Sequence, residues 1–87
     1  ANNKGFGYHI TLTNLPKSAC VSLATLNLGT SAAGYGINVN DPAGVTLTAS
    51  SNASTSNFMK INAISPSDAS TSCGNASNNN SVTYFMK

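Results

Sequence analysis

The two cysteines constrain what this chain can fold into more than any other feature of its sequence. Cys20 and Cys73 are the only cysteines among 87 residues, and they enclose most of the chain. A chain this short buries only about 60% of its extended surface, so its apolar core alone stabilises it marginally. A widely spaced cysteine pair in a small, charge-poor domain predicts a disulfide formed in an oxidising compartment. Two separate buried thiols are the alternative.

The composition excludes several classes of function. Charged residues make up 7% of the chain, where about 25% is usual, and the net charge is +2. Four dispersed lysines cannot neutralise a run of phosphates, so we expect no nucleic-acid binding. The sequence contains no apolar run of about 18 residues that could span a membrane. Asn, Ser and Thr are abundant instead, which favours a surface of neutral hydrogen-bonding groups.

The first predicted element is a strand. Apolar and polar residues alternate over residues 8–13, a pattern typical of a half-buried strand. We expect Tyr8, Ile10 and Leu12 to face the core.

A helix is predicted to follow. Pro16 suits the start of a helix, because the missing N–H costs nothing in the first turn. Apolar residues then recur at helical spacing over residues 17–28, and Gly29 is a plausible stop. This helix carries Cys20 near its start.

The rest of the chain predicts shorter elements. Residues 30–36 are small and glycine-rich and are expected to form a loop, whereas Ser65-Pro66 is typical of a helix start. The other elements expected are a hairpin of residues 36–40 and 45–49, a strand over 58–64, a short helix ending near Cys73, and a strand over 82–87. Residues 1–87 are therefore predicted to form one α+β domain: an antiparallel sheet of about four or five strands, with one longer and one short helix on one face.

Catalytic and metal-binding residues are not predicted. His9 is the only histidine and falls on the polar side of the first strand, so a solvated side chain is the favoured interpretation. The two aspartates fit structural roles, since Asp41 opens a turn and Asp68 follows a helix start. No cofactor-binding motif occurs. We therefore expect no enzyme activity, no metal and no cofactor.

Two kinds of surface are candidates for interaction. Val21, Ala24 and Leu28 form a second apolar face on the predicted helix, which would either lie beneath the loop of residues 30–36 or pack on a neighbouring subunit. Two polar segments are expected to be exposed loops. Their residues of interest are Ser51, Asn52, Ser54, Asn75, Asn78 and Asn79.

The segment Ile10–Leu23, ITLTNLPKSACVSL, resembles the start of the disulfide-bounded region of type IV pilins, and it is closest to the type IVb branch. In that family a strand runs through a short turn into a helix that carries the first cysteine. A second cysteine follows near the C-terminus, before a short strand with threonine and aromatic residues. Cys73 and the segment Ser81–Phe85, SVTYF, match that ending.

This resemblance implies a structural function. The chain would be the globular headgroup of an extracellular, bacterial cell-surface filament, with other pilin subunits as partners. The long hydrophobic helix that anchors such subunits in the membrane before assembly would lie outside this sequence: it was removed, or the sequence covers only the headgroup of a longer protein, or the helix belongs to a separate chain. The cysteine-bearing helix would pack on the next subunit, and the polar loops would form a variable outer surface. The alternative is a minor pilin, a tip adhesin or a secreted carbohydrate-binding module, with a site around Tyr35 and Asn38.

Overall fold

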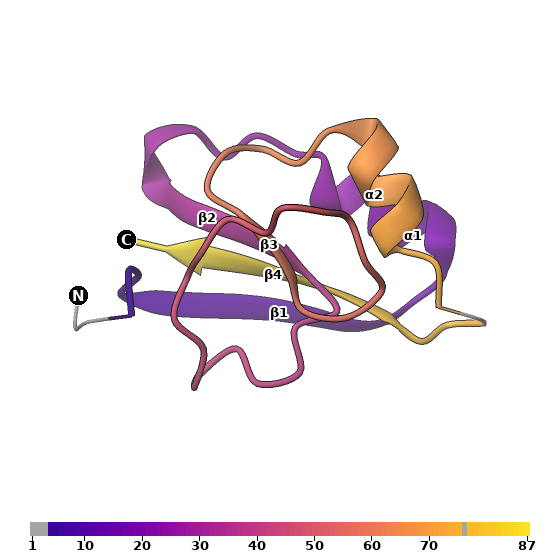
Figure 1. Cartoon of the computed structure of the whole chain (residues 1–87), viewed down its shortest axis with the longest axis horizontal. Coiled ribbons are helices and arrows are strands. Elements are labelled where there is room, and N and C mark those ends of the chain that lie inside the picture. Colours follow the sequence, from indigo (N-terminus) through magenta and orange to yellow (C-terminus); the bar gives the residue numbers. More distant parts are fainter. Residues whose placement is uncertain (1–3, 76) are drawn as a thin grey trace.

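The computed structural model describes residues 4–75 and 77–87, which form a four-stranded antiparallel sheet with two helices on one face (Figure 1). The strands lie in the order β1-β4-β2-β3, and each neighbouring pair is antiparallel. This arrangement confirms the predicted α+β class. In chain order the elements are β1 (Tyr8–Leu15), α1 (Lys17–Ala24), the 3₁₀ turn η1 (Gly29–Ser31), β2 (Ala32–Ile37), β3 (Phe58–Lys60), α2 (Pro66–Ser72) and β4 (Asn80–Met86).

The C-terminal strand β4 lies between β1 and β2. Tyr84 is opposite Ile10 on one side and opposite Tyr35 on the other. The strand alternates as the sequence predicts, so that Val82 and Phe85, both fully buried, point to opposite faces. Each face of the sheet therefore has its own apolar cluster anchored on β4.

The two clusters are covered by different structures. On the helix side, Ile37, Phe58 and Val82 share a cluster with the buried residues of α1 and α2. On the other side, Phe85 meets Phe6 at a ring-centroid distance of 4.7 Å, and the long connection between β2 and β3 covers them with apolar side chains. This connection thus takes the place of a helical layer on the second face.

The short helix α2 begins as the sequence predicts. The Ser65 hydroxyl accepts a hydrogen bond from the Asp68 backbone N–H at 3.2 Å, and Pro66 occupies the first helical position. A serine cap satisfies one of the N–H groups that a helix start leaves without an intrahelical partner.

The longer helix is shorter than predicted, because α1 ends at Ala24 rather than at residue 28. The Thr25 hydroxyl donates to the Val21 carbonyl oxygen at 2.9 Å, which closes the last turn. The Leu28 N–H then donates to the Tyr35 hydroxyl oxygen at 2.9 Å instead of continuing the helix. A tertiary hydrogen bond to the sheet therefore overrides the helical periodicity beyond Ala24.

The predicted hairpin is wrong. Part of the expected loop over 30–36 forms β2, while residues 45–49 form no strand and the strand expected over 58–64 shortens to β3. The glycines of β2 explain this difference, because they allow neighbouring segments to approach closely. A Cβ atom at Gly36 would lie 2.7 Å from Val39 Cγ2, and one at Gly34 would lie 2.8 Å from the Leu47 side chain.

The burial predicted for the first strand is also wrong. Tyr8, Ile10 and Leu12 are 55%, 49% and 36% exposed, although the strand itself lies where it was expected. They share the helix side of the sheet with the residues opposite them on β4. The helices cover β4 and leave this row on β1 open to solvent.

The Tyr84 hydroxyl generates a prediction about alkaline stability. It donates to the Leu23 carbonyl oxygen at 2.6 Å, so it joins β4 to α1. Burial raises the pKa of Tyr84, and the neighbouring Tyr35 raises it further. A raised pKa means that folding favours the neutral phenol. The stability that this preference contributes is present below about pH 10, the usual tyrosine pKa, and is lost as the pH rises through the folded pKa.

We therefore expect Tyr84→Phe to lower the free energy of unfolding by about 1–2 kcal/mol at pH 7, because the Leu23 carbonyl oxygen loses its hydrogen bond from the Tyr84 hydroxyl and keeps only the longer one, at 3.4 Å, from the Leu26 N–H. As the pH rises above 9, the free energy of unfolding of this variant should fall less than that of the wild type. Urea unfolding followed by circular dichroism measures both effects. Tyr8→Phe, which removes an exposed hydroxyl, should match the wild type at pH 7; identical alkaline profiles for wild type and Tyr84→Phe would refute the assignment.

Candidate functional site

The predicted disulfide is confirmed and joins the two helices. Cys20 in α1 and Cys73 at the end of α2 are bonded with their Cα atoms 5.8 Å apart, and both are fully buried. They are 53 positions apart, so the covalent loop contains β2, β3 and α2. β4 lies outside that loop in the sequence but between β1 and β2 in the sheet. The disulfide therefore holds the two helices together over the sheet. Strands β1 and β4, which lie near the two ends of the chain, complete that sheet.

Beside the disulfide, a buried pair of asparagines joins several chain segments. Asn38 donates from Nδ2 to the Ser72 carbonyl oxygen at 2.9 Å and to Asn80 Oδ1 at 3.2 Å. Its Oδ1 accepts from the Ser81 N–H at 2.8 Å. Asn38 has a φ of 55°, a left-handed conformation that asparagine adopts more readily than most residues.

Asn80, the second of the pair, is fully buried and connects the start of β4 with the end of β1. Its Nδ2 donates to the carbonyl oxygens of Leu15 at 3.4 Å and Asn75 at 3.1 Å, and its Oδ1 also accepts from the Asn75 N–H at 3.1 Å. The sequence does not reveal this role, because one asparagine in an Asn-rich loop carries no signal that marks it as buried.

The carbohydrate site considered for Tyr35 and Asn38 has almost no accessible surface. Tyr35 is 2% exposed, its hydroxyl accepts from Leu28, and its ring meets Tyr84 edge-on. Asn38 is buried and uses its amide within the fold. Neither residue can stack on or hydrogen-bond to a sugar at the surface.

The predicted subunit-packing residues differ in their accessibility. Ala24 is fully buried, while Val21 and Leu28 are half-buried and pack partly on the helix-side core. Leu26, which follows the end of α1, is 47% exposed. Only Val21 and Leu28 of the predicted face can reach another molecule, and their role in packing stays a prediction.

The two predicted loops lie beside the disulfide-bounded helices. The first loop is attached to α2, because the Ser54 N–H donates to the Ser72 hydroxyl at 3.2 Å. In the second loop, Asn75 is half-buried by its contacts with Asn80. The other predicted loop residues are exposed: Ser51, Asn52, Ser54, Asn78 and Asn79. Their variability among related proteins stays a prediction.

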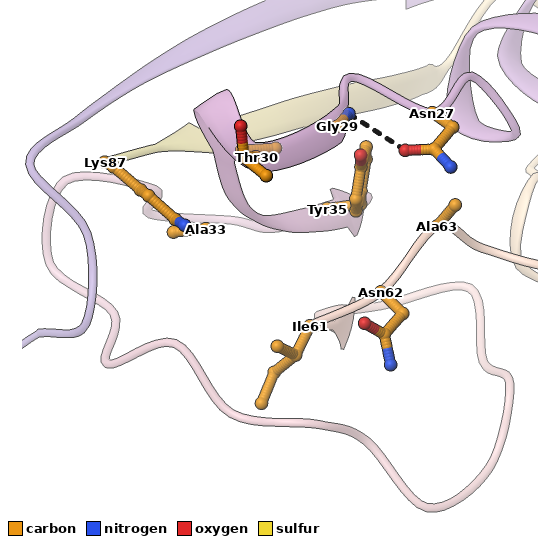
Figure 2. A pocket seen from close by; sticks show the side chains of 10 residues that line it. Asn27, Gly29, Thr30, Ala33, Tyr35, Ile61, Asn62, Ala63 and Lys87 are labelled. Carbon is orange, nitrogen blue, oxygen red and sulfur yellow. Dashed lines mark hydrogen bonds between the residues drawn. The ribbon is translucent and has the colours of Figure 1, made fainter.

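A pocket of about 480 Å³ opens where β2 begins, and Figure 2 shows the residues that line it. Asn27, Asn62 and Lys87 supply polar groups, and Asn27 Oδ1 accepts from the Gly29 N–H at 2.9 Å. No histidine, cysteine or carboxylate side chain lines it. The pocket therefore offers hydrogen bonds and one positive charge, and no pair of groups suited to proton transfer.

Residues 4–75 and 77–87 contain neither a cluster of metal-ligating side chains nor a helix that could span a membrane. No three or more His, Cys, Asp or Glu side chains come together there in a way that could hold a metal ion. His9 lies 6.4 Å from the Phe6 ring, between centroids. Within the same residues, neither helix has the length and apolar character needed to cross a bilayer.

Comparison with known proteins places the sequence beside pilus subunits. No family model and no solved structure matches the chain. It is 54% identical over 86 residues to the "major structural subunit of bundle-forming pilus" of Escherichia coli O111:H- and to the protein of the same name in E. coli O127:H6, strain E2348/69. Each match covers 99% of this chain and 43% of the relative, so the chain spans less than half the length of these proteins. The resemblance to type IVb pilins is thereby confirmed.

Reduction of the disulfide should lower stability strongly. The chain-entropy model assigns about 4 kcal/mol to a loop of this length, because the bond limits the unfolded chain. We expect urea unfolding with a reductant to show a loss of about 2–4 kcal/mol relative to the oxidised protein. The double variant Cys20→Ala, Cys73→Ala serves as the control and should not respond to the reductant. A loss below about 1 kcal/mol would show that the bond adds little.

Asn80→Ala should destabilise the domain by about 3 kcal/mol, because the buried Asn38 amide and the partly buried backbone groups of Asn75 and Leu15 each lose a hydrogen bond. Asn79→Ala is the matched control, since Asn79 is the adjacent residue and is exposed. We expect this control to stay within about 0.5 kcal/mol of the wild type. Thermal and urea unfolding of both variants measure the difference. Equal stabilities would mean that the Asn80 amide does not hold the chain ends together.

Proposed function

We propose, on the premise that this chain belongs with the type IVb pilins, that it is the globular headgroup of a structural subunit in an extracellular bacterial filament. The observation that carries the proposal is the 54% identity over nearly the whole chain to major structural subunits of a pilus. The role is assembly rather than catalysis, and it needs no cofactor.

The physical properties of the domain suit this role. A covalent bond between its helices keeps the domain folded outside the cell, where disulfides persist. A net charge of only +2 on 87 residues allows many copies to pack together without strong mutual repulsion.

The partners that we propose are other pilin subunits and a hydrophobic helix. The curated relatives are more than twice as long as this chain, which leaves ample length for such a helix. The helix would belong to the same longer protein or to a separate chain. Contact with a membrane would occur only through it, before assembly.

A tip adhesin or a secreted carbohydrate-binding module is the weaker alternative. The site predicted for it is buried at Tyr35 and Asn38. The pocket at the start of β2 offers no exposed aromatic face on which a sugar could stack, because its only aromatic residue is Tyr35. No observation therefore favours this function over the structural one.

Shearing of surface filaments from cells that produce the protein tests the proposal. We expect the chain, detected by non-reducing mass spectrometry, to pellet with the filaments with its cysteines bonded. A protein that stays in the supernatant would contradict the filament role.

The same assay tests the predicted subunit contact at α1. Val21→Lys should lower the pelleted amount by about tenfold, because a charge buried against a neighbour without a partner is costly. Ser22→Lys, at the adjacent and exposed position, should pellet like the wild type. Thermal unfolding of both purified domains confirms that they fold. Filaments that accept Val21→Lys normally would remove Val21 from the interface.

A further inference from the structure

This chain carries only four lysines and two aspartates, and the structure describes all of them. The Lys4 ammonium donates to the carbonyl oxygen of Ala43. The Lys60 ammonium donates to the carbonyl oxygen of Ser50 at 2.8 Å. Asp68 is half-buried in the first turn of α2, where a carboxylate stabilises the helix. Within residues 4–75 and 77–87, the remaining charged groups have no hydrogen-bond or ion-pair partner: those of Lys17, Asp41 and Lys87.

Lys87 differs from Lys17 because it lines the pocket at the start of β2. Figure 2 shows Asn27 and Asn62 on two facing walls of this pocket, with Lys87 at one end. Asn27 Oδ1 is occupied by the Gly29 N–H, which leaves the Asn27 Nδ2 group to donate elsewhere. Two amide groups and one ammonium group together suit a carboxylate, which accepts hydrogen bonds only.

Asp41 begins a tight turn over residues 41–44, which we call the Asp41 turn. Its carbonyl oxygen accepts from the N–H groups of Gly44 at 3.0 Å and Val45 at 3.1 Å, so the backbone fixes the turn. A Cβ atom at Gly44 would collide with the Asp41 carboxylate, so the glycine makes room for that group. Asp41, Ala43 and Gly44 are exposed. The turn therefore presents one carboxylate to solvent on a narrow, fixed support.

The pocket and the Asp41 turn lie at opposite ends of β2. Ala32 and Ala33, at the beginning of the strand, line the pocket, and the turn begins four residues after Ile37, its last residue. A strand of six residues is about 20 Å long. In Figure 1 the first part of the connection after β2 lies below the sheet, away from the start of β2. A subunit therefore keeps its own Asp41 away from its own pocket.

We infer that the Asp41 turn of one subunit docks in the pocket of the next, where its carboxylate pairs with Lys87 and accepts hydrogen bonds from Asn27 and Asn62. The inference rests on the proposed filament function and names the partner as a second copy of this chain. Charge complementarity selects this pair, because each copy has one unpartnered carboxylate and one unpartnered ammonium at a pocket. Ile61, 55% exposed on the pocket wall, adds apolar surface for the contact to bury.

The separation of the two groups allows this contact to repeat. Each added copy fills one pocket and leaves one Asp41 turn and one pocket free at the two ends of the row. Such a contact between different patches continues along a filament, whereas a self-complementary patch closes into a pair.

Charge reversal in the filament-shearing assay tests this contact. Lys87→Asp should lower the pelleted amount by about tenfold, because two carboxylates then face each other in the interface. The matched control is the double variant Ser51→Asp, Asn52→Asp, which changes the net charge by the same amount at two exposed loop positions. We expect this control to pellet like the wild type. An equal loss in both would show that filaments respond to net charge alone, which overturns the inference.

Co-production of two variants identifies the occupant as a second copy. Asp41→Lys alone should also pellet about tenfold less, because its new ammonium group meets Lys87. When Lys87→Asp and Asp41→Lys subunits are made in the same cells, each pocket can receive the opposite charge from the other variant. We therefore expect the pelleted amount to recover to at least about half that of the wild type. No recovery would overturn the inference, because a contact within one subunit, or with a different partner, gains nothing from mixing.

A pair of neutral variants keeps the test decisive if thermal unfolding shows that a charge-reversed domain does not fold. Asp41→Asn keeps a residue that favours the first position of a turn, and Lys87→Gln keeps a long polar side chain. Each should lower the pelleted amount by about threefold, and the double variant should lower it no further, because both changes remove the same pair. Losses that multiply in the double variant would refute the pairing.

The outcomes distinguish this inference from the proposed function. Absence of the wild type from filaments refutes the filament role itself. Normal pelleting of a folded Lys87→Asp variant, beside normal wild type, refutes only the contact at the pocket.

Discussion

The fold depends on the insertion of β4 between β1 and β2. This strand contributes Val82 and Tyr84 to the helix-side core and Phe85 to the core on the other face. Its start is fixed by the Asn80 amide, and its middle is tied to α1 by the Tyr84 hydroxyl. Both layers of the domain therefore need the end of the chain in place. Pairing between such distant segments costs loop-closure entropy and slows folding. The disulfide reduces that entropy cost, because it limits the unfolded chain.

Neutral amides and hydroxyls take the place that charged pairs have in most small domains. In residues 4–75 and 77–87, every buried side-chain nitrogen or oxygen atom has a hydrogen-bond partner. Asn38, Asn80 and Ser72 all lie near the ends of elements, where backbone groups would otherwise lack partners. An amide that donates and accepts at once can join two backbones without the desolvation penalty of a buried charge. The Asn- and Ser-rich composition is thus partly internal structure as well as surface.

Local patterns predicted the elements but not how they pack. Strand β1, the start of α1, the Ser65 cap, β4 and the disulfide follow from alternation, helix-start residues and the cysteine count. The hairpin failed because Gly34 and Gly36 are typical of a loop by composition, although here they mark close contacts within the sheet. The prediction that the β1 side chains are buried failed, because alternation identifies one face of a strand and does not show whether another layer covers that face.

The same limit applies to the candidate interaction surfaces. The burial of Asn80 and the exposure of Tyr8, Ile10 and Leu12 on β1 depend on the strand order, which no local sequence pattern contains. Val21 was recognised because helical spacing gave α1 more apolar surface than one sheet contact needs. Ala24, at the same spacing, is fully buried.

The two open apolar regions of the domain have different consequences for a filament. Subunits that join head to tail need two different complementary patches, whereas a single self-complementary patch closes into a pair. Apart from Tyr8, Ile10 and Leu12 on β1, the large apolar side chains that are exposed in residues 4–75 and 77–87 are Leu26 and Ile61, with the half-buried Leu28 nearby in sequence. Ile61 lines the pocket at the start of β2, and Leu26 and Leu28 flank Asn27, another lining residue. Contacts between neighbouring subunits are then expected to centre on that pocket and the end of α1, away from the sheet edge.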